Sequence, residues 1–298
     1  MDKIHAVQKM QNYICEHLND DDFSIEDVCR TVGYSRRNAE RLFKEYLNTT
    51  LRKYIDSVCL TNWAKDLLDT KKTVAYIAYD NHFKSHEGFT RSFNKKFHIT
   101  PSEYRNQKIA IPLFVQYPIL NYYVLLKYKE ELNMSNNISL CMITPQERPK
   151  RKLIYLPSKK AQDYVSYCEE VGCEWEGLLN SIPEKLDTAA LIDLPDFLVE
   201  NGFSKIAAGV EVPLDYNKVL PTQYKVAELL PCTMLYFQSE PYEKQEDFCI
   251  AIESAYNAIS KYNPTLYGYK FSYDIAPSFN FGAEMTTGAK IAVPVLHI

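Results

Sequence analysis

Two short stretches of the sequence carry clusters of arginine and lysine at helical spacing. A guanidinium group can donate two parallel hydrogen bonds to a phosphate or to the edge of a guanine, and a carboxylate can accept one from a cytosine amino group. These residue types therefore suit contacts with a nucleic acid. The candidate contact residues are Arg36, Arg37, Glu40, Arg41 and Lys44 in the first stretch, and Ser85, His86, Glu87, Thr90 and Arg91 in the second.

The elements that must position these residues are two copies of one pattern, at 24–50 and 73–100. Each copy reads as a short helix, a tight turn and a longer basic helix, which is typical of a helix-turn-helix motif. After the turn the copies align at an offset of fifty, so that Arg41 matches Arg91. Before the turn the offset is one less, and the second turn therefore holds one extra residue. Loops tolerate such insertions and helices do not, so the shift supports a true repeat.

A single helix is predicted between the two motifs, over 51–69. At 1.5 Å per residue it would be roughly 28 Å long, close to the roughly 34 Å advance of one turn of DNA. A rigid spacer of this length would let two recognition helices enter successive major grooves from one face of a duplex.

At this point a family resemblance becomes specific. The sequence GYS at 33–35, the RxF pattern that ends at Phe93, and TPSEYR at 100–105 resemble the DNA-binding domain of AraC/XylS transcription regulators. The resemblance covers about a third of the chain. It implies an all-α domain over 1–106 that binds double-stranded DNA, with RNA polymerase as a further partner.

The sequence departs from this family pattern at two places. The family's usual glycine in the second turn is His82 here, which predicts strain in that turn. In the spacer helix Cys59 stands before Leu60 where the family often has an arginine, so one contact could be lost.

Charge divides the chain into two halves. Residues 1–105 hold 17 Lys and Arg against 15 Asp and Glu, a net charge of +2. The remainder holds 17 and 23, a net charge of −6. The front half can approach a polyanion and the back half would avoid one. We expect 107–145 to connect the halves, with the apolar stretch 113–132 forming a helix or arm packed on the second domain.

A second repeat, at an offset of 81 residues, occupies the back half. KLIYLPS at 152–158 aligns with TMLYFQS at 233–239, and AAGVEVP at 207–213 aligns with GAKIAVP at 288–294. Helical stretches at 162–181 and 245–261 lie between the matched strands. The pattern predicts a multidomain protein in which the all-α double helix-turn-helix domain is followed by an α+β domain of two βαββ repeats.

Residues 146–298 resemble the GyrI-like effector-binding domain, through KIAVPV at 290–295 and APSFNF at 276–281. The resemblance implies a small-molecule effector. Many such domains have an acidic residue near the closing strand that receives cations, and Lys290 stands there in this chain. A preference for cations should therefore not be carried over, although Glu174, Glu211 and Glu284 remain possible acids.

Sixteen of the 23 tyrosines lie beyond residue 105, which favours an aromatic pocket, although any single one is more often a core residue. A lysine in that pocket could favour an anionic or neutral ligand, or it could simply pair with Glu284 or reach solvent. The candidate ligand residues are Tyr155, Tyr167, Trp175, Tyr236, Phe281 and Lys290.

Other chemistries find little support in the sequence. The eight cysteines form no CxxC pair, His82 and His86 have no third metal ligand near them, and His297 is the only histidine beyond residue 150. We therefore expect no catalytic residues, no cofactor, no metal site, no membrane span and a cytoplasmic location. Two alternatives stay open for the back half, namely a GyrI-like hydrolase and a sensor that works by protein contact.

Overall fold

Short helices with polar N-caps build the first half of the chain. The computed structural model describes residues 3–20, 22–80, 85–130 and 140–298, so His82 and the predicted strain at its turn lie outside the described residues. Ser35, Thr50, Ser85 and Thr100 each accept a hydrogen bond from a backbone N–H in the first turn of the helix that follows. The helices are α1 Lys3–His17, α2 Ile25–Arg30, α3 Arg36–Leu47, α4 Leu51–Asp69, α5 Val74–Asp80, α6 His86–Phe97, α7 Pro101–Gln107 and α8 Ile119–Glu130.

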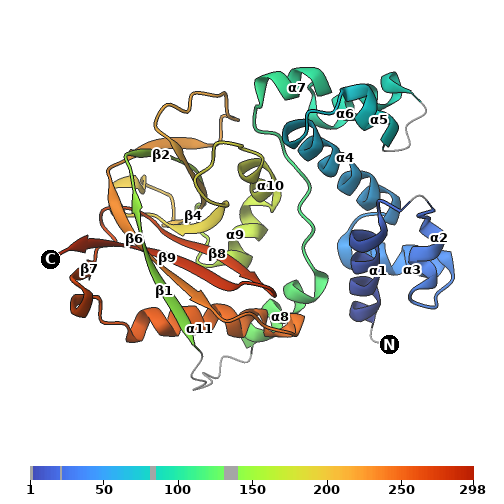
Figure 1. The fold of residues 1–298 in the computed structure, drawn as a ribbon. Helices are drawn as coiled ribbons and strands as arrows, with labels where there is room; N and C mark the ends of the chain where they lie inside the picture. Colours follow the sequence, from blue (N-terminus) through green and yellow to red (C-terminus); the bar gives the residue numbers. More distant parts are fainter. Residues whose placement is uncertain (1–2, 21, 81–84, 131–139) are drawn as a thin grey trace. The chain divides into compact units, whose positions relative to one another are not determined.

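Helix α4 is shared by two separate cores. Leu51, Tyr54 and Val58 in its first half pack with α1, α2 and α3. Trp63 and Leu67 in its second half pack with α5, α6 and α7. One rigid helix thereby holds both helix-turn-helix motifs, as the predicted spacer over 51–69 requires (Figure 1).

The segment that follows α7 returns along the same helices. Its residues Ile109, Ile111 and Leu113 pack on the second core, and Phe114 and Ile119 pack on the first. We call residues 109–119 the strap. The first compact unit of the chain accordingly continues to Tyr123 and does not end at 106, and the second unit is Val124–Ile298. The expectation that all of 113–132 would pack on the second domain is wrong for the strap.

Buried polar side chains hold the strap in place. Thr61 Oγ1 accepts a hydrogen bond from the Phe114 N–H at 2.8 Å. The Gln11 amide donates to the Tyr117 carbonyl and accepts from the Ile119 N–H, both at 2.9 Å. These contacts pair backbone groups that a strap without secondary structure would otherwise bury unsatisfied.

One antiparallel sheet organises the second unit (Figure 1). Its strands are β1 Cys141–Arg148, β2 Arg151–Pro157, β3 Ala190–Asp193, β4 Ile206–Pro213, β5 Lys225–Leu229, β6 Cys232–Ser239, β7 Tyr269–Phe271, β8 Ser278–Glu284 and β9 Gly288–His297. They lie in the order β1-β6-β9-β8-β3-β4-β2-β5, with β7 also paired to β9. A helical region followed by a region rich in antiparallel sheet is thus confirmed.

The strand order reads symmetrically about the β3–β8 pair. Strands β2 and β6 begin 81 residues apart, at Arg151 and Cys232. Strand β1 precedes β2 in the chain yet pairs with β6, while β5 precedes β6 and pairs with β2. The first strand of each half is therefore exchanged onto the other half.

Two details differ from the gapless repeat. The helix expected over 162–181 is two helices, α9 Tyr164–Val171 and α10 Glu174–Asn180, because the chain turns at Gly172 with a φ of 87°. The offset of 81 places the counterpart of β3 at 271–274. The chain instead has a break there, between β7 and β8, so the offset of 81 does not hold for this strand.

The two faces of the sheet build different cores. Leu235 and Phe237 pack under α11, Phe248–Lys261. Because successive side chains of a strand point to opposite faces, Met234 and Tyr236 lie on the other side of the sheet, in the same core as Tyr155. We call this side the inner face of the sheet.

Candidate functional sites

The outer side of α3 carries the first group of predicted contact residues. Ala39, Leu42 and Phe43 are buried on the inner side of this helix. The helical period therefore leaves the basic residues outward. Arg36, Arg37, Arg41 and Lys44 are all exposed, and Glu40 is half-buried.

Carboxylates hold two of these guanidinium groups. Arg36 Nε lies 3.0 Å from Glu40 Oε1, and Arg36 also pairs with Glu26. Arg41 Nη1 lies 3.4 Å from Glu45 Oε2. All these pairs are exposed, so each is weak and a phosphate can replace its carboxylate. On this face Glu40 orients Arg36, and its predicted contact with a cytosine stays a prediction.

Helix α6 presents the second group in the same way. Phe89, Phe93 and Phe97 are buried in the second core, while His86, Glu87 and Arg91 are exposed. The Ser85 hydroxyl accepts the Gly88 N–H at 3.1 Å. Ser85 is therefore the N-cap of this helix, the role that Ser35 has in α3.

Glu87 and Thr90, also predicted to contact DNA, differ in how accessible they are on α6. Hydrogen bonds from the Glu87 backbone and from Ser85 lower the pKa of the Glu87 carboxyl, so it is ionised at neutral pH. Thr90 is half-buried, and its Oγ1 is buried without a hydrogen-bond partner among the described residues. Of the predicted contacts on α6, His86, Glu87 and Arg91 are the most accessible.

Comparisons with known proteins address this first unit. A family model described as a helix-turn-helix domain matches residues 28–107. The transposon Tn10 TetD protein of Escherichia coli is 40% identical over 94 residues, which is 32% of this chain and 68% of that protein. The regulatory protein SoxS of Salmonella typhimurium is 33% identical over 101 residues, 34% of this chain and 94% of SoxS. The chain belongs to the AraC/XylS family of transcription regulators.

The similarity of this AraC/XylS-family chain to its relatives is partial. The match to the regulator YkgA of Escherichia coli spans 35% of that protein. A solved transcriptional regulator from Chromobacterium violaceum, described as AraC-type, is 31% identical, covers 35% of this chain and 91% of its own, and has a TM-score of 0.33. DNA binding by the first unit follows from the family, and the activity of the whole chain does not.

Four of the six predicted ligand residues lie on the inner face of the sheet. Tyr155 is a buried member of its core. Tyr236, Phe281 and Lys290 meet on the same face, with the Tyr236 and Phe281 rings stacked at 6.0 Å between centroids. The Lys290 Nζ atom lies 4.2 Å from the centroid of the Phe281 ring and 5.8 Å from that of Tyr236.

Tyr167 and Trp175 do not join this group. They pack edge to face on α9 and α10, with centroids 6.0 Å apart. The Tyr167 hydroxyl donates to the Leu156 carbonyl at 2.7 Å. Both side chains are buried and pack these helices against the sheet.

Two charged residues that the sequence did not single out, Arg148 and Asp187, complete the inner-face group. Asp187 Oδ1 lies 2.8 Å from Lys290 Nζ. Arg148 pairs with Asp187 at 3.4 Å and donates to the Tyr236 hydroxyl. We call Arg148, Asp187, Tyr236, Phe281 and Lys290 the inner cluster. Burial raises the pKa of the Tyr236 phenol, which therefore stays protonated at neutral pH.

A buried ion pair continues the inner cluster along β4. Glu211 Oε1 lies 2.6 Å from Arg151 Nε, and Glu211 Oε2 lies 3.4 Å from Arg148 Nε. Arg151 is fully buried and also donates to the Leu230 carbonyl. Of the three acids named from the sequence, Glu211 contacts this cluster, whereas Glu174 and Glu284 are exposed. The resemblance to GyrI-like domains drew attention to Glu211 and Lys290, but no local signal indicated Asp187, which lies in a loop.

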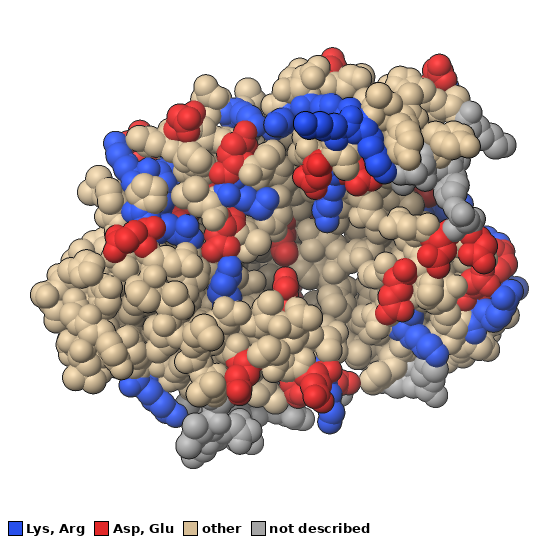
Figure 2. Space-filling view, viewed as in Figure 1, with Lys and Arg blue, Asp and Glu red and all other residues tan. Residues whose placement is uncertain are grey.

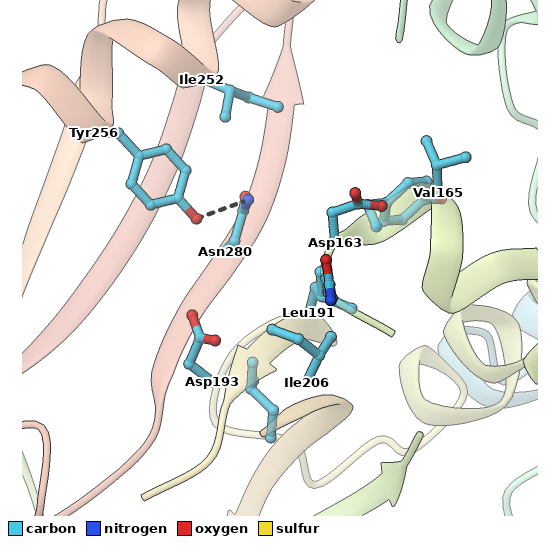
Figure 3. Close-up of a pocket in the computed structure, with 11 residues that line it drawn as sticks. Asp163, Val165, Leu191, Asp193, Ile206, Ile252, Tyr256 and Asn280 are labelled. Carbon is cyan, nitrogen blue, oxygen red and sulfur yellow. Dashed lines mark hydrogen bonds between the residues drawn. The ribbon is translucent and has the colours of Figure 1, made fainter. Parts of the chain in front are cut away.

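The other face of the sheet holds a groove of about 290 Å³ between α9 and α11, over the β3–β8 pair (Figure 3). Its walls include Val165, Leu191 and Ile252, and the Asn280 amide donates to the Tyr256 hydroxyl at 3.3 Å. None of the six predicted ligand residues lines this groove.

The described residues also bear on the expectations about charge, metal binding and membrane spans. In the view of Figure 2, Lys and Arg side chains are interspersed with Asp and Glu. Among the described residues, no group of three or more His, Cys, Asp or Glu is arranged to hold a metal ion. No helix in that part of the chain is long and apolar enough to cross a membrane.

Proposed function

We propose that this chain is a one-component transcription regulator whose first unit binds two adjacent half-sites of duplex DNA. The observation that carries the proposal is the pair of capped, basic helices α3 and α6, anchored in two cores that share α4. A spacer of 19 residues, roughly 28 Å long, is close to one turn of the duplex.

Footprinting of the full-length protein on its operator tests this proposal. We expect two protected segments one helical turn apart, with one chain bound per operator. Protection confined to a single major groove, or binding that requires two chains, would contradict it.

We further propose that the second unit is a GyrI-like domain of two βαββ repeats that binds a small effector at the inner cluster. The symmetric strand order and the stacked rings beside opposite charges support this assignment. The effector is expected to shift DNA affinity, with RNA polymerase as a further partner of the bound regulator. Substitution of Tyr236 by Phe or of Phe281 by Ala should remove the effector response in cells while leaving operator binding intact.

Two alternatives have definite tests. A hydrolase should turn over apolar electrophiles, and its activity should depend on the buried carboxylate Glu211. A sensor that works by protein contact alone should leave no footprint with purified protein.

A further inference from the structure

Three groups converge on the Lys290 ammonium. The Phe281 and Tyr236 ring centroids lie 4.2 and 5.8 Å from Nζ, and Asp187 Oδ1 lies 2.8 Å away. Aromatic faces together with a carboxylate are the usual components of a site for an organic cation. We propose that Lys290 is a tethered cation that fills this site, so that the wild-type chain rejects organic cations as effectors. The proposal rests on the inner cluster being the effector site proposed above.

The carboxylate of this site is held in place. Asp187 Oδ1 accepts from Lys290 and from the Thr188 N–H at 2.8 Å. Asp187 Oδ2 lies 3.2 Å from the Tyr236 hydroxyl and 3.4 Å from Arg148 Nη2. The Asp187 side chain is 21% exposed and that of Arg148 only 11%. An ordinary surface ion pair has mobile partners, whereas this carboxylate is oriented by four hydrogen bonds.

The strand geometry also brings the Lys290 and Phe281 side chains together. Lys290 and Ala292 alternate with Ile291 along β9, and Ala292 lies in the inner-face core. The β8–β9 register shifts between Asn280 and Ala283, and Gly282 within this bulge has a φ of 77°. A bulge re-aims the neighbouring side chain, and here it sets Phe281 against the ammonium.

The charge count predicts which ligands the site accepts. Arg148, Arg151 and Lys290 carry three positive charges against two on Asp187 and Glu211. Of the three positively charged side chains, that of Lys290 is the most exposed, at 32%. A second cation would meet an occupied site and a like charge. An acid or a neutral polar molecule would meet a partly desolvated ammonium. Lys290 is thus the residue that determines the charge of the effector.

The decisive experiment removes the tethered cation and supplies a free one. Lys290→Ala deletes the chain beyond Cβ, and n-butylammonium chloride provides an ammonium on an alkyl chain of similar length. Lys290→Met is the matched control, because it fills the same space without charge. Binding is measured on the full-length proteins by thermal shift and calorimetry, with potassium chloride at equal concentration to control for ionic strength.

We expect n-butylammonium to bind Lys290→Ala at least tenfold more tightly than it binds the wild type or Lys290→Met. The double variant Asp187→Asn with Lys290→Ala should lose this gain. Equal binding to wild type and Lys290→Ala would overturn the proposal, as would no binding to a folded Lys290→Ala. If Lys290→Ala fails to fold, Lys290→Ser with the same probe decides by the same criteria. Operator binding is measured in parallel, so that a failure of the cation site is distinguished from a failure of the proposed regulator function.

Discussion

At the residue scale, DNA recognition is predicted to depend on single side chains on α3 and α6. Arg41 and Arg91 occupy matching positions and both are exposed. Arg41 forms only an exposed pair with Glu45, so its release costs little. We therefore expect each arginine to donate to a guanine edge when the operator is bound.

Replacement of either arginine by alanine should therefore weaken operator binding by about 1–3 kcal/mol. Titration of operator and random DNA with Arg41→Ala and Arg91→Ala measures this loss. Arg52→Ala is the matched control, because Arg52 is an equally exposed arginine on α4 that pairs with Asp56 at 3.1 Å. Equal losses on operator and random DNA would mean that the two arginines contact phosphates only.

The Glu176 carboxyl makes the stability of the second unit depend on pH. Burial raises the pKa of this carboxyl to about 7. The folded protein therefore keeps this proton up to near neutrality, whereas the unfolded chain releases it near its ordinary pKa of about 4.3. Stability consequently falls as pH rises between these two values.

Glu176→Gln should remove this dependence. We expect the free energy of unfolding to rise by roughly 3 kcal/mol at pH 8 and to change little at pH 4. Urea unfolding at the two pH values measures the difference, with Glu174→Gln on the same helix as an exposed control. A gain of equal size at both pH values would show that the raised pKa is not its cause.

Among the elements, the strap is the one whose role depends on tertiary contacts. It crosses from the second core to the first and is held by the side chains of Gln11 and Thr61. The Gln11 amide also donates to the Tyr54 hydroxyl at 3.0 Å, which joins α1, α4 and the strap. The strap therefore joins the two helix-turn-helix motifs by a second connection besides α4.

Gln11→Ala should lower the free energy of unfolding of the first unit by about 1–3 kcal/mol, because it leaves buried backbone groups unpaired. Chemical denaturation followed by Trp63 fluorescence measures the change. Gln107→Ala, at an exposed position on α7, should stay within about 0.5 kcal/mol of wild type. If the two variants are equally stable, the strap is not anchored by Gln11.

At the scale of the whole molecule, each unit has its own cores and its own tryptophan. The chain has two tryptophans, Trp63 in the first unit and Trp175 in the second. Both are buried, so each reports on the packing of its unit. Single-tryptophan variants can therefore follow the two units separately in the full-length chain.

Operator DNA should raise the unfolding temperature seen by Trp63 and leave that seen by Trp175 nearly unchanged. A ligand stabilises the unit that binds it, by about 2.7 kcal/mol at a hundred times its Kd. Thermal unfolding of Trp175→Phe and Trp63→Phe with and without operator makes the comparison, and random DNA at the same salt concentration is the control. A shift of equal size in both variants would show that the units unfold as one.

Local rules let the sequence determine most of the first unit. The N-caps, the helical periodicity and the spacer over 51–69 depend on residues within one or two turns of each other. The ends of α4 therefore agree with the predicted helix over 51–69. The same rules identified the basic face of α3, since a period of 3.6 residues requires only that one side be buried.

Tertiary structure alone decided the rest, because it depends on contacts between residues far apart in the chain. Lys290 meets Asp187 across 103 positions, and no periodicity indicates which loop carboxylate a strand lysine will face. The exchange of β1 and β5 between halves, and the return of the strap along α1 and α4, are likewise choices among partners that the sequence leaves equally possible. They are settled by which arrangement buries the apolar faces and pairs the backbone groups of the whole unit at once.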